Sequence, residues 1–123
     1  MPSPSEPTLR ESERRLLDRW IGLLDERLGD DLRAVWLYGS RARGEPPREG
    51  SDVDVITLTR YGSPDDERAA DDLLEEAAGQ VGGDPWSISV RVYDEGWPGR
   101  RRAIDAFFMR EVDRDKVVLA GEP

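Results

Sequence analysis

One segment of this 123-residue chain limits its fold more than any other. It joins two apolar runs and contains residues that exclude regular secondary structure. The runs cover residues 32–38 and 53–58. Each is short, apolar and bounded by turn-forming residues, which predicts a β-strand. Between them, Pro46, Pro47 and Gly50 exclude a continuous helix. The sequence therefore predicts two strands joined by a turn and an irregular loop.

The second run begins with two acids, Asp52 and Asp54, which share one side of the predicted strand. Because side chains alternate along a strand, Val53 and Val55 lie on the opposite side. Aspartate is a poor strand former, and two carboxylates about 6 Å apart repel by roughly 3 kcal/mol at an effective dielectric constant of about 20. A divalent metal ion would offset this repulsion, so both acids are candidate metal ligands and catalytic residues. The plainer alternative is a solvated acidic strand.

Gly39 and Ser40 directly follow the first run and are candidates for a phosphate-binding turn. If a helix begins at Ser40, its free backbone N–H groups and the Ser40 hydroxyl form a pocket for an anion. Gly39 has no side chain to keep a phosphate away. Arg41 or Arg43 would add positive charge there, unless both are solvated. A phosphate turn beside paired acids suits a nucleoside triphosphate that carries Mg²⁺.

Residues 39–44, with the sequence G-S-R-A-R-G, and residues 51–54, with the sequence S-D-V-D, together resemble a known signature. It is that of the polymerase-beta-type nucleotidyltransferase superfamily in its minimal (MNT) branch, and the chain is similar to the MntA-like antitoxins of that branch. The resemblance implies transfer of a nucleoside monophosphate, typically AMP from ATP, with pyrophosphate leaving. It also implies metal binding by Asp52 and Asp54, with Mg²⁺ or Mn²⁺ as the ion, and nucleotide binding by Gly39 and Ser40.

The same resemblance implies a third metal-binding carboxylate on the strand beside the paired acids. The expected strand covers residues 86–93, and three of its residues share the side of the acids: Ser87, Ser89 and Arg91. None is an acid, although acids flank the strand: Asp84, Asp94 and Glu95. Three interpretations stay open: the site works with two acids, a partner contributes a ligand, or the chain is a binding module without catalysis. In the last case Arg91 would offset the charge of the aspartates.

Helical periodicity marks three further segments, residues 9–28, 64–81 and about 100–112. Thr8 and Glu11 have the spacing of a capping box before the first, and Ser63 is placed as the N-cap of the second. The expected fold class is α/β (α+β), with a small mixed sheet and helices on one face, as in nucleotidyltransferases. The other face is expected to be open and to carry the paired acids.

The ends of the chain complete this organisation. Residues 1–7 hold three prolines and two serines, which predicts a disordered leader. Residues 8–123 have room for a single domain with one modest core. Residues 116–120 predict a short strand at the edge of the sheet.

Composition excludes several classes of function. The chain has no cysteine and no histidine, which excludes a thiolate zinc site, a disulfide framework and a histidine base. The net charge is −9 and no long basic stripe appears, which disfavours long nucleic acid as a partner. No apolar run approaches the length of a membrane span or of a signal peptide core, which predicts a cytoplasmic protein.

Two hypotheses of different classes follow. The first is a Mg²⁺-dependent nucleotidyltransferase that moves AMP from ATP, or a nucleoside monophosphate from another triphosphate, to an acceptor presented from outside. The resemblance implies a helical HEPN-type toxin as that partner. The second is a non-catalytic MNT-fold antitoxin that masks its partner by contact alone.

Overall fold

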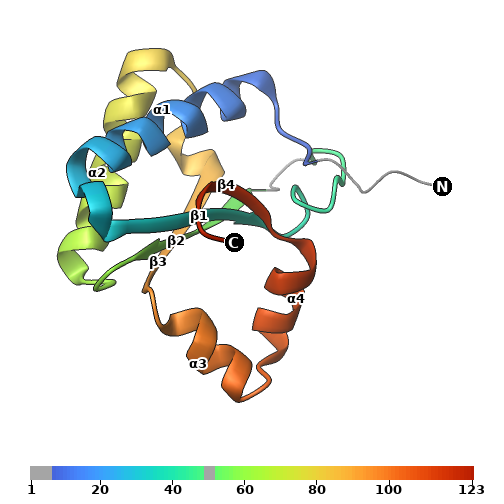
Figure 1. Ribbon diagram of the computed structural model, residues 1–123. Helices are drawn as coiled ribbons and strands as arrows, with labels where there is room; N and C mark the ends of the chain where they lie inside the picture. The colour runs from blue at the N-terminus through green and yellow to red at the C-terminus, as the bar shows by residue number, and fades with distance from the viewer. Residues whose placement is uncertain (1–6, 49–51) are drawn as a thin grey trace.

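The computed structural model describes residues 7–48 and 52–123 and shows a four-stranded sheet between two pairs of helices (Figure 1). Residues 1–6 of the predicted leader, and Gly50 and Ser51 of the predicted loop and signature, lie outside the described part. The main elements are α1 (Glu11–Leu28), β1 (Leu32–Tyr38), β2 (Val53–Thr59), α2 (Pro64–Val81), β3 (Ile88–Asp94), α3 (Trp97–Ala103), α4 (Phe107–Asp115) and β4 (Val117–Gly121).

The strands form a mixed sheet in the order β3-β2-β1-β4. Strand β1 is antiparallel to both β2 and β4, whereas β2 and β3 are parallel and joined through α2. The predicted strands at residues 32–38 and 53–58 are confirmed, and β4 is the predicted edge strand. The fold class predicted from the sequence, a small mixed sheet with helices, is therefore confirmed.

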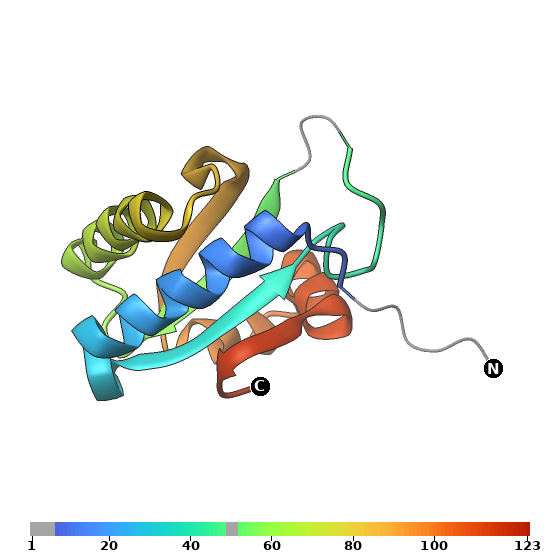
Figure 2. The same cartoon turned by 90° about the horizontal axis from the view of Figure 1, so that it is seen from above.

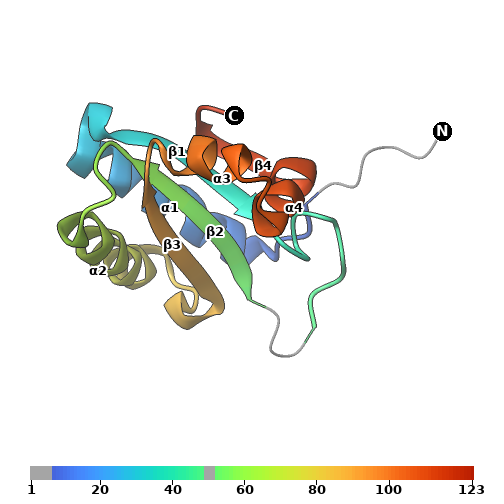
Figure 3. The ribbon, with the colours of Figure 1, turned by 90° about the horizontal axis from the view of Figure 1, so that it is seen from below.

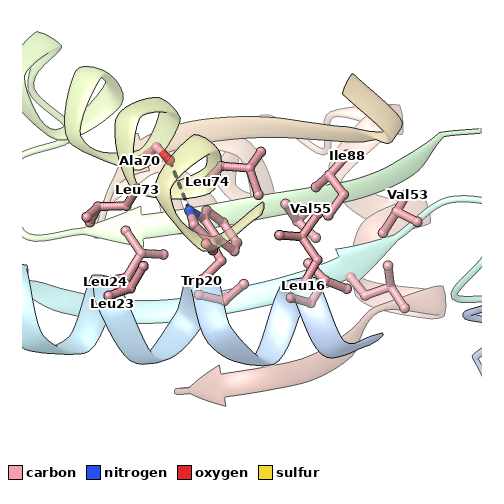
Figure 4. Close-up of a cluster of buried hydrophobic side chains, with 14 of the residues drawn as sticks. Leu16, Trp20, Leu23, Leu24, Val53, Val55, Ala70, Leu73, Leu74 and Ile88 are labelled. Carbon is pink, nitrogen blue, oxygen red and sulfur yellow. Dashed lines mark hydrogen bonds between the residues drawn. The ribbon is translucent and has the colours of Figure 1, made fainter. Parts of the chain in front are cut away.

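Helices α1 and α2 cover one face of the sheet (Figures 1 and 2). Trp20 of α1 is fully buried between them, and its Nε1 donates a hydrogen bond of 3.0 Å to the carbonyl oxygen of Ala70 on α2 (Figure 4). Val53 and Val55 of β2 point into the same core, as alternation predicts. This packing fixes the register of β2, and so places Asp54 on the other face.

The N-termini of the two helices differ in how well the sequence predicted them. Helix α2 begins where expected, since Ser63 Oγ accepts a 3.1 Å hydrogen bond from the Asp66 N–H. The predicted capping box of Thr8 and Glu11 is wrong. Helix α1 begins at Glu11, and the Glu13 carboxylate accepts a 2.7 Å hydrogen bond from the Arg10 N–H instead. Thr8 is not a cap because its backbone pairs with Arg41.

The opposite face is not open along its whole width, which corrects the expectation of helices on one face only. Helices α3 and α4 pack there, over β1, β4 and part of β2 (Figure 3). A second core fills this layer: Ala34, Trp36, Tyr38, Ile56, Leu58, Trp97, Met109 and Val112. The physical reason is that β1 and β2 are apolar on both faces, so each face needs a cover. On this face, α3 and α4 leave most of β3 and the adjoining part of β2 uncovered (Figure 3).

Two element boundaries also differ from the prediction. The single helix expected over residues 100–112 is two helices, separated at Asp105, whose φ of 51° ends the regular helix. Strand β3 begins at Ile88 rather than at residue 86, because residues 85–87 form a 3₁₀ turn. None of the helices in the described residues is long and apolar enough to cross a membrane.

Candidate functional site

The predicted acid pair lies at one end of β2, on the face that α3 and α4 only partly cover. Asp54 is half-buried and pairs with Tyr38 of β1 on one side and with Ser89 of β3 on the other. Asp52 precedes the strand and is exposed. Three neighbouring strands therefore place Tyr38, Asp54 and Ser89 in one row across the sheet.

The surroundings of Asp54 disfavour its charged form. Burial raises the pKa of the Asp54 carboxyl above its ordinary value, and the negative charge of Asp52 raises it further. The positive charges of Arg91 and Arg41 act in the opposite direction but are outweighed. A cation placed between Asp52 and Asp54 would lower this unfavourable energy.

Gly39 brings the turn after β1 directly against Asp54. Its φ is 77°, a left-handed conformation that glycine adopts without steric cost. A Cβ added at Gly39 would lie 2.9 Å from Asp54 Oδ2, closer than real Cβ atoms approach an oxygen. The absence of a side chain at Gly39 thus allows the turn and the carboxylate to meet.

The helix predicted to begin at Ser40 is absent, which corrects the expected geometry of the phosphate pocket. Residues 40–44 form consecutive turns, in which the Arg43 N–H donates to the Gly39 carbonyl at 3.2 Å and the Glu45 N–H donates to the Ser40 carbonyl at 3.0 Å. The chain cannot continue as a helix because Gly44 has a φ of 82°. Ser40 is half-buried beside Gly39, so it still lies next to the acids, but on a turn.

The side chain of Arg41 is buried and binds α1. Its side chain is 1% exposed and pairs with Glu13 of α1, which is 5% exposed, through hydrogen bonds of 2.8 and 2.9 Å from its two terminal nitrogens. Nη1 also donates to the Thr8 carbonyl at 2.9 Å. Arg41 therefore ties the turn to α1, and its positive charge still acts on Asp54. Arg43 is partly exposed, and its guanidinium pairs with Glu45 at 2.8 Å.

Sequence reasoning missed Glu13, although a signal was present. Glu13 precedes Leu16, Leu17 and Trp20 by three, four and seven positions, so it belongs to the apolar stripe of α1. An acid on such a stripe is buried and needs a partner. Sequence reasoning also missed Phe108 of α4, which with Tyr38 and Gly39 lines a hollow of about 120 Å³ at the turn.

The structure narrows the question of the third carboxylate. Ser89 is the β3 residue directly opposite Asp54, whereas Ser87 lies in the 3₁₀ turn and lines a hollow against α1. Asp94 pairs with Thr59 at the far end of β2, and its carboxylate binds Arg100 at 2.6 Å. The register therefore places Asp94 five positions along the sheet from Asp54, away from the acid pair.

The other two flanking acids are also engaged away from the pair. Glu95 binds Arg33 at 3.0 Å, and Asp84 accepts a hydrogen bond of 2.9 Å from the Trp86 N–H. Over residues 7–48 and 52–123 no group of three or more acids is placed to hold a metal ion. Two carboxylates nevertheless suit Mg²⁺, which proteins commonly bind through one or two carboxylates and the phosphates of a substrate.

Arg91 lies one row further along β3, opposite Ile56, and is exposed. Its Nη1 donates a long hydrogen bond of 3.5 Å to the Tyr93 hydroxyl, and its guanidinium lies 5.6 Å from the Phe108 ring centre. The positive charge of Arg91 lowers the pKa of Asp54, but burial and the charge of Asp52 outweigh it, so the pKa stays raised.

A glycine-serine turn therefore lies against Asp54, next to Asp52, at one end of a mixed sheet. The family model described as "Nucleotidyltransferase domain" matches residues 17–108 of this chain. The chain therefore belongs to the nucleotidyltransferase domain family, and this membership supports nucleotidyl transfer as its general activity.

Among solved structures, the chain is similar to a candidate nucleotidyltransferase from Sulfolobus solfataricus, with 20% identity and a TM-score of 0.42. The alignment covers 93% of this chain and 91% of that one. No curated protein sequence matches the chain.

Proposed function

We propose that this chain is a Mg²⁺-dependent nucleotidyltransferase that moves AMP from ATP to an acceptor presented by another molecule. The observation that carries the proposal is the contact between the Gly39 turn and the Asp54 carboxylate, where an added Cβ would lie 2.9 Å from Asp54 Oδ2. A phosphate held at the turn would lie beside the acids, where a metal ion can neutralise both. A cytoplasmic location and the MNT branch of the family are part of the proposal.

Each residue of the site has a distinct role in this proposal. Asp52 and Asp54 would hold Mg²⁺, or Mn²⁺ in its place, as hard anionic ligands. When bound, such an ion neutralises phosphate charge and lowers the pKa of an attacking hydroxyl. Gly39 lets the terminal phosphates approach the backbone, and the Ser40 hydroxyl donates a hydrogen bond to them. Arg41 and Glu13 keep the turn in position through their contact with α1.

The acceptor lies outside this domain, and we propose a helical HEPN-type protein as the partner. The second candidate function is a non-catalytic antitoxin module that masks this partner. Two observations favour it: Ser89 stands opposite Asp54 where a third acid would complete the site, and the positive charge of Arg91 partly opposes the rise in the pKa of Asp54.

The two functions are distinguished by following transfer of labelled AMP from ATP to a purified HEPN-type partner, in Mg²⁺ and in Mn²⁺. The enzyme predicts labelled partner with the wild-type chain and a loss of at least a hundredfold with Asp52→Asn or Asp54→Asn. The matched control is Asp18→Asn, an exposed acid on α1 that should leave transfer unchanged. A partner that is silenced but never labelled would contradict the enzyme and support the masking module.

A further inference from the structure

Strand β3 is an uncovered edge of the sheet. It ends the order β3-β2-β1-β4 and pairs only with β2 within the described residues. Its seven residues extend about 23 Å at roughly 3.3 Å per residue. No other strand of the described residues pairs with the backbone on its outer side, and such edges are a common place for strand addition.

A groove follows this edge, between β3 and α2. It consists of two adjoining hollows of about 380 and 270 Å³, which share Asp71 as a lining residue. The first borders residues 90–93 of β3, and the second borders Ile88 and Trp86. Figure 3 shows α2 on the outer side of β3. The edge therefore has both backbone partners and space for the side chains of an added strand.

The α2 wall of the groove is acidic. Glu67, Asp71 and Glu75 line it at intervals of four residues, so they lie on one face of the helix. All three are exposed, and no salt bridge of theirs occurs in the described part of the chain. The cation in the lining, Arg91, makes its contacts with Tyr93 and Phe108. Three like charges repel one another and favour a basic ligand.

Trp86 lies at one end of the groove and is 87% exposed. A large aromatic side chain with so little cover costs free energy in water, and such residues are frequent anchors at protein interfaces. Pro85 and Leu74 line the same hollow and make it partly apolar. The groove thus has acids along its length and an aromatic surface at the Trp86 end.

We propose that this groove binds an extended segment of another protein, which adds to β3 as a fifth strand and carries lysine or arginine at alternate positions. An apolar side chain of the segment lies against Trp86, and its basic side chains lie against Glu67, Asp71 and Glu75. A second copy of this chain does not fit, because its own β3 edge would bring the same acids and because the chain carries a net charge of −9. The inference does not depend on nucleotidyl transfer.

The test uses a fluorescent nonapeptide of alternating lysine and valine with one terminal leucine, and a matched peptide with glutamate in place of lysine. Binding to the full chain is followed by fluorescence anisotropy at 50 and 150 mM salt. The lysine peptide should bind at least tenfold more tightly than the glutamate peptide. The triple variant Glu67→Gln, Asp71→Asn, Glu75→Gln should lose about tenfold in affinity, consistent with three exposed charge pairs.

A control triple variant, Asp65→Asn, Asp72→Asn, Glu76→Gln, removes the same number of charges from exposed positions of α2 outside the groove. It should change affinity by less than threefold. Equal losses in the two triple variants would show attraction by net charge alone and would overturn the proposal. Trp86→Ala should cost a further fivefold or more, and an unchanged affinity would remove Trp86 from the site.

Strand addition itself is tested by methylating the backbone nitrogens of the lysine peptide. Alternate N–H groups of an added strand face β3, so methylation at odd positions and at even positions should differ. One pattern should reduce affinity at least tenfold, and the other less than threefold. Equal effects of both patterns would contradict strand pairing. A concentration-dependent dimer in analytical ultracentrifugation that excludes the peptide would assign the edge to a second copy and overturn the proposal.

Discussion

The buried pair of Arg41 and Glu13 should control the stability of the turn that carries the candidate site. Arg41→Met removes the guanidinium and leaves the Glu13 carboxylate 5% exposed without its partner. Breaking a buried pair in this way typically costs about 3–5 kcal/mol, because an uncompensated charge stays buried. A domain of this size is stable by about 5–15 kcal/mol, so the variant should fold but be clearly weakened.

The measurement is urea denaturation at pH 7, followed by the fluorescence of the four tryptophans. Glu13→Leu combined with Arg41→Met removes both charges, and this double variant should recover most of the loss, because apolar replacement of a buried pair is often neutral. A double-mutant cycle gives the coupling energy between the two residues. If the double variant is as unstable as Arg41→Met alone, Arg41 acts through its contact with Thr8 and the reasoning is refuted.

The stability that the Arg41–Glu13 pair contributes should depend on pH with a definite sign. Burial by itself would raise the pKa of Glu13, but the hydrogen bonds from the Arg41 guanidinium and from the Arg10 N–H outweigh it, and the pKa is lowered. The stabilisation from this pair is therefore complete above the ordinary glutamate pKa of about 4.3 and is lost as the pH falls through the folded-state value. In Arg41→Met burial is opposed only by Arg10, so the pKa of Glu13 is higher than in the wild type and the penalty shrinks on acidification. The stability difference between wild type and variant should narrow from pH 7 to pH 4, and a constant difference would contradict this account.

Two further predictions concern the site itself. Ser40→Ala should weaken binding of ATP with Mg²⁺ by about 1–3 kcal/mol in calorimetry, as expected for one hydrogen bond to a charged group. Gly39→Val should be worse, because its Cβ would meet the Asp54 carboxylate at a φ of 77°, and a silent Gly39→Val would exclude the turn as a phosphate site. Ser89→Asp should raise AMP transfer, because Ser89 stands opposite Asp54, whereas Ser87→Asp should leave it unchanged. A larger gain from Ser87→Asp would mean that the register of β3 at the site is wrong.

The sequence predicted most of the fold because its local signals agree with its tertiary packing. The strand predicted at residues 32–38 has the same bounds as β1, because a short apolar run between turn residues has few alternative structures. Ser63 and Pro64 likewise begin α2 where capping chemistry requires. The face that Asp54 occupies was also predictable, because alternation along β2 buries Val53 and Val55 on the other side.

The errors arose where tertiary contacts decide the structure. The periodicity of α3 and α4 does not predict which face of the sheet they cover. An apolar stripe shows which side of a helix is buried, but not against which element it packs. The turn after Gly39 was expected to be helical, but Arg41 is held by Glu13, which is 28 residues away in the chain. Local sequence patterns do not reveal a pair of residues so far apart in the chain. The one signal was an acid, Glu13, on the apolar stripe of α1.

The central claim is that a metal-bound triphosphate lies between the Gly39 turn and the acid pair. The most direct measurement adds Mn²⁺ and ATP to ¹⁵N-labelled protein and maps the amide signals that the paramagnetic ion broadens. We expect the signals of Gly39, Ser40 and Asp54 to broaden first, and Asp54→Asn to restore them. Broadening that begins instead at the acidic wall of α2, around Glu67, Asp71 and Glu75, and persists in Asp54→Asn would contradict it.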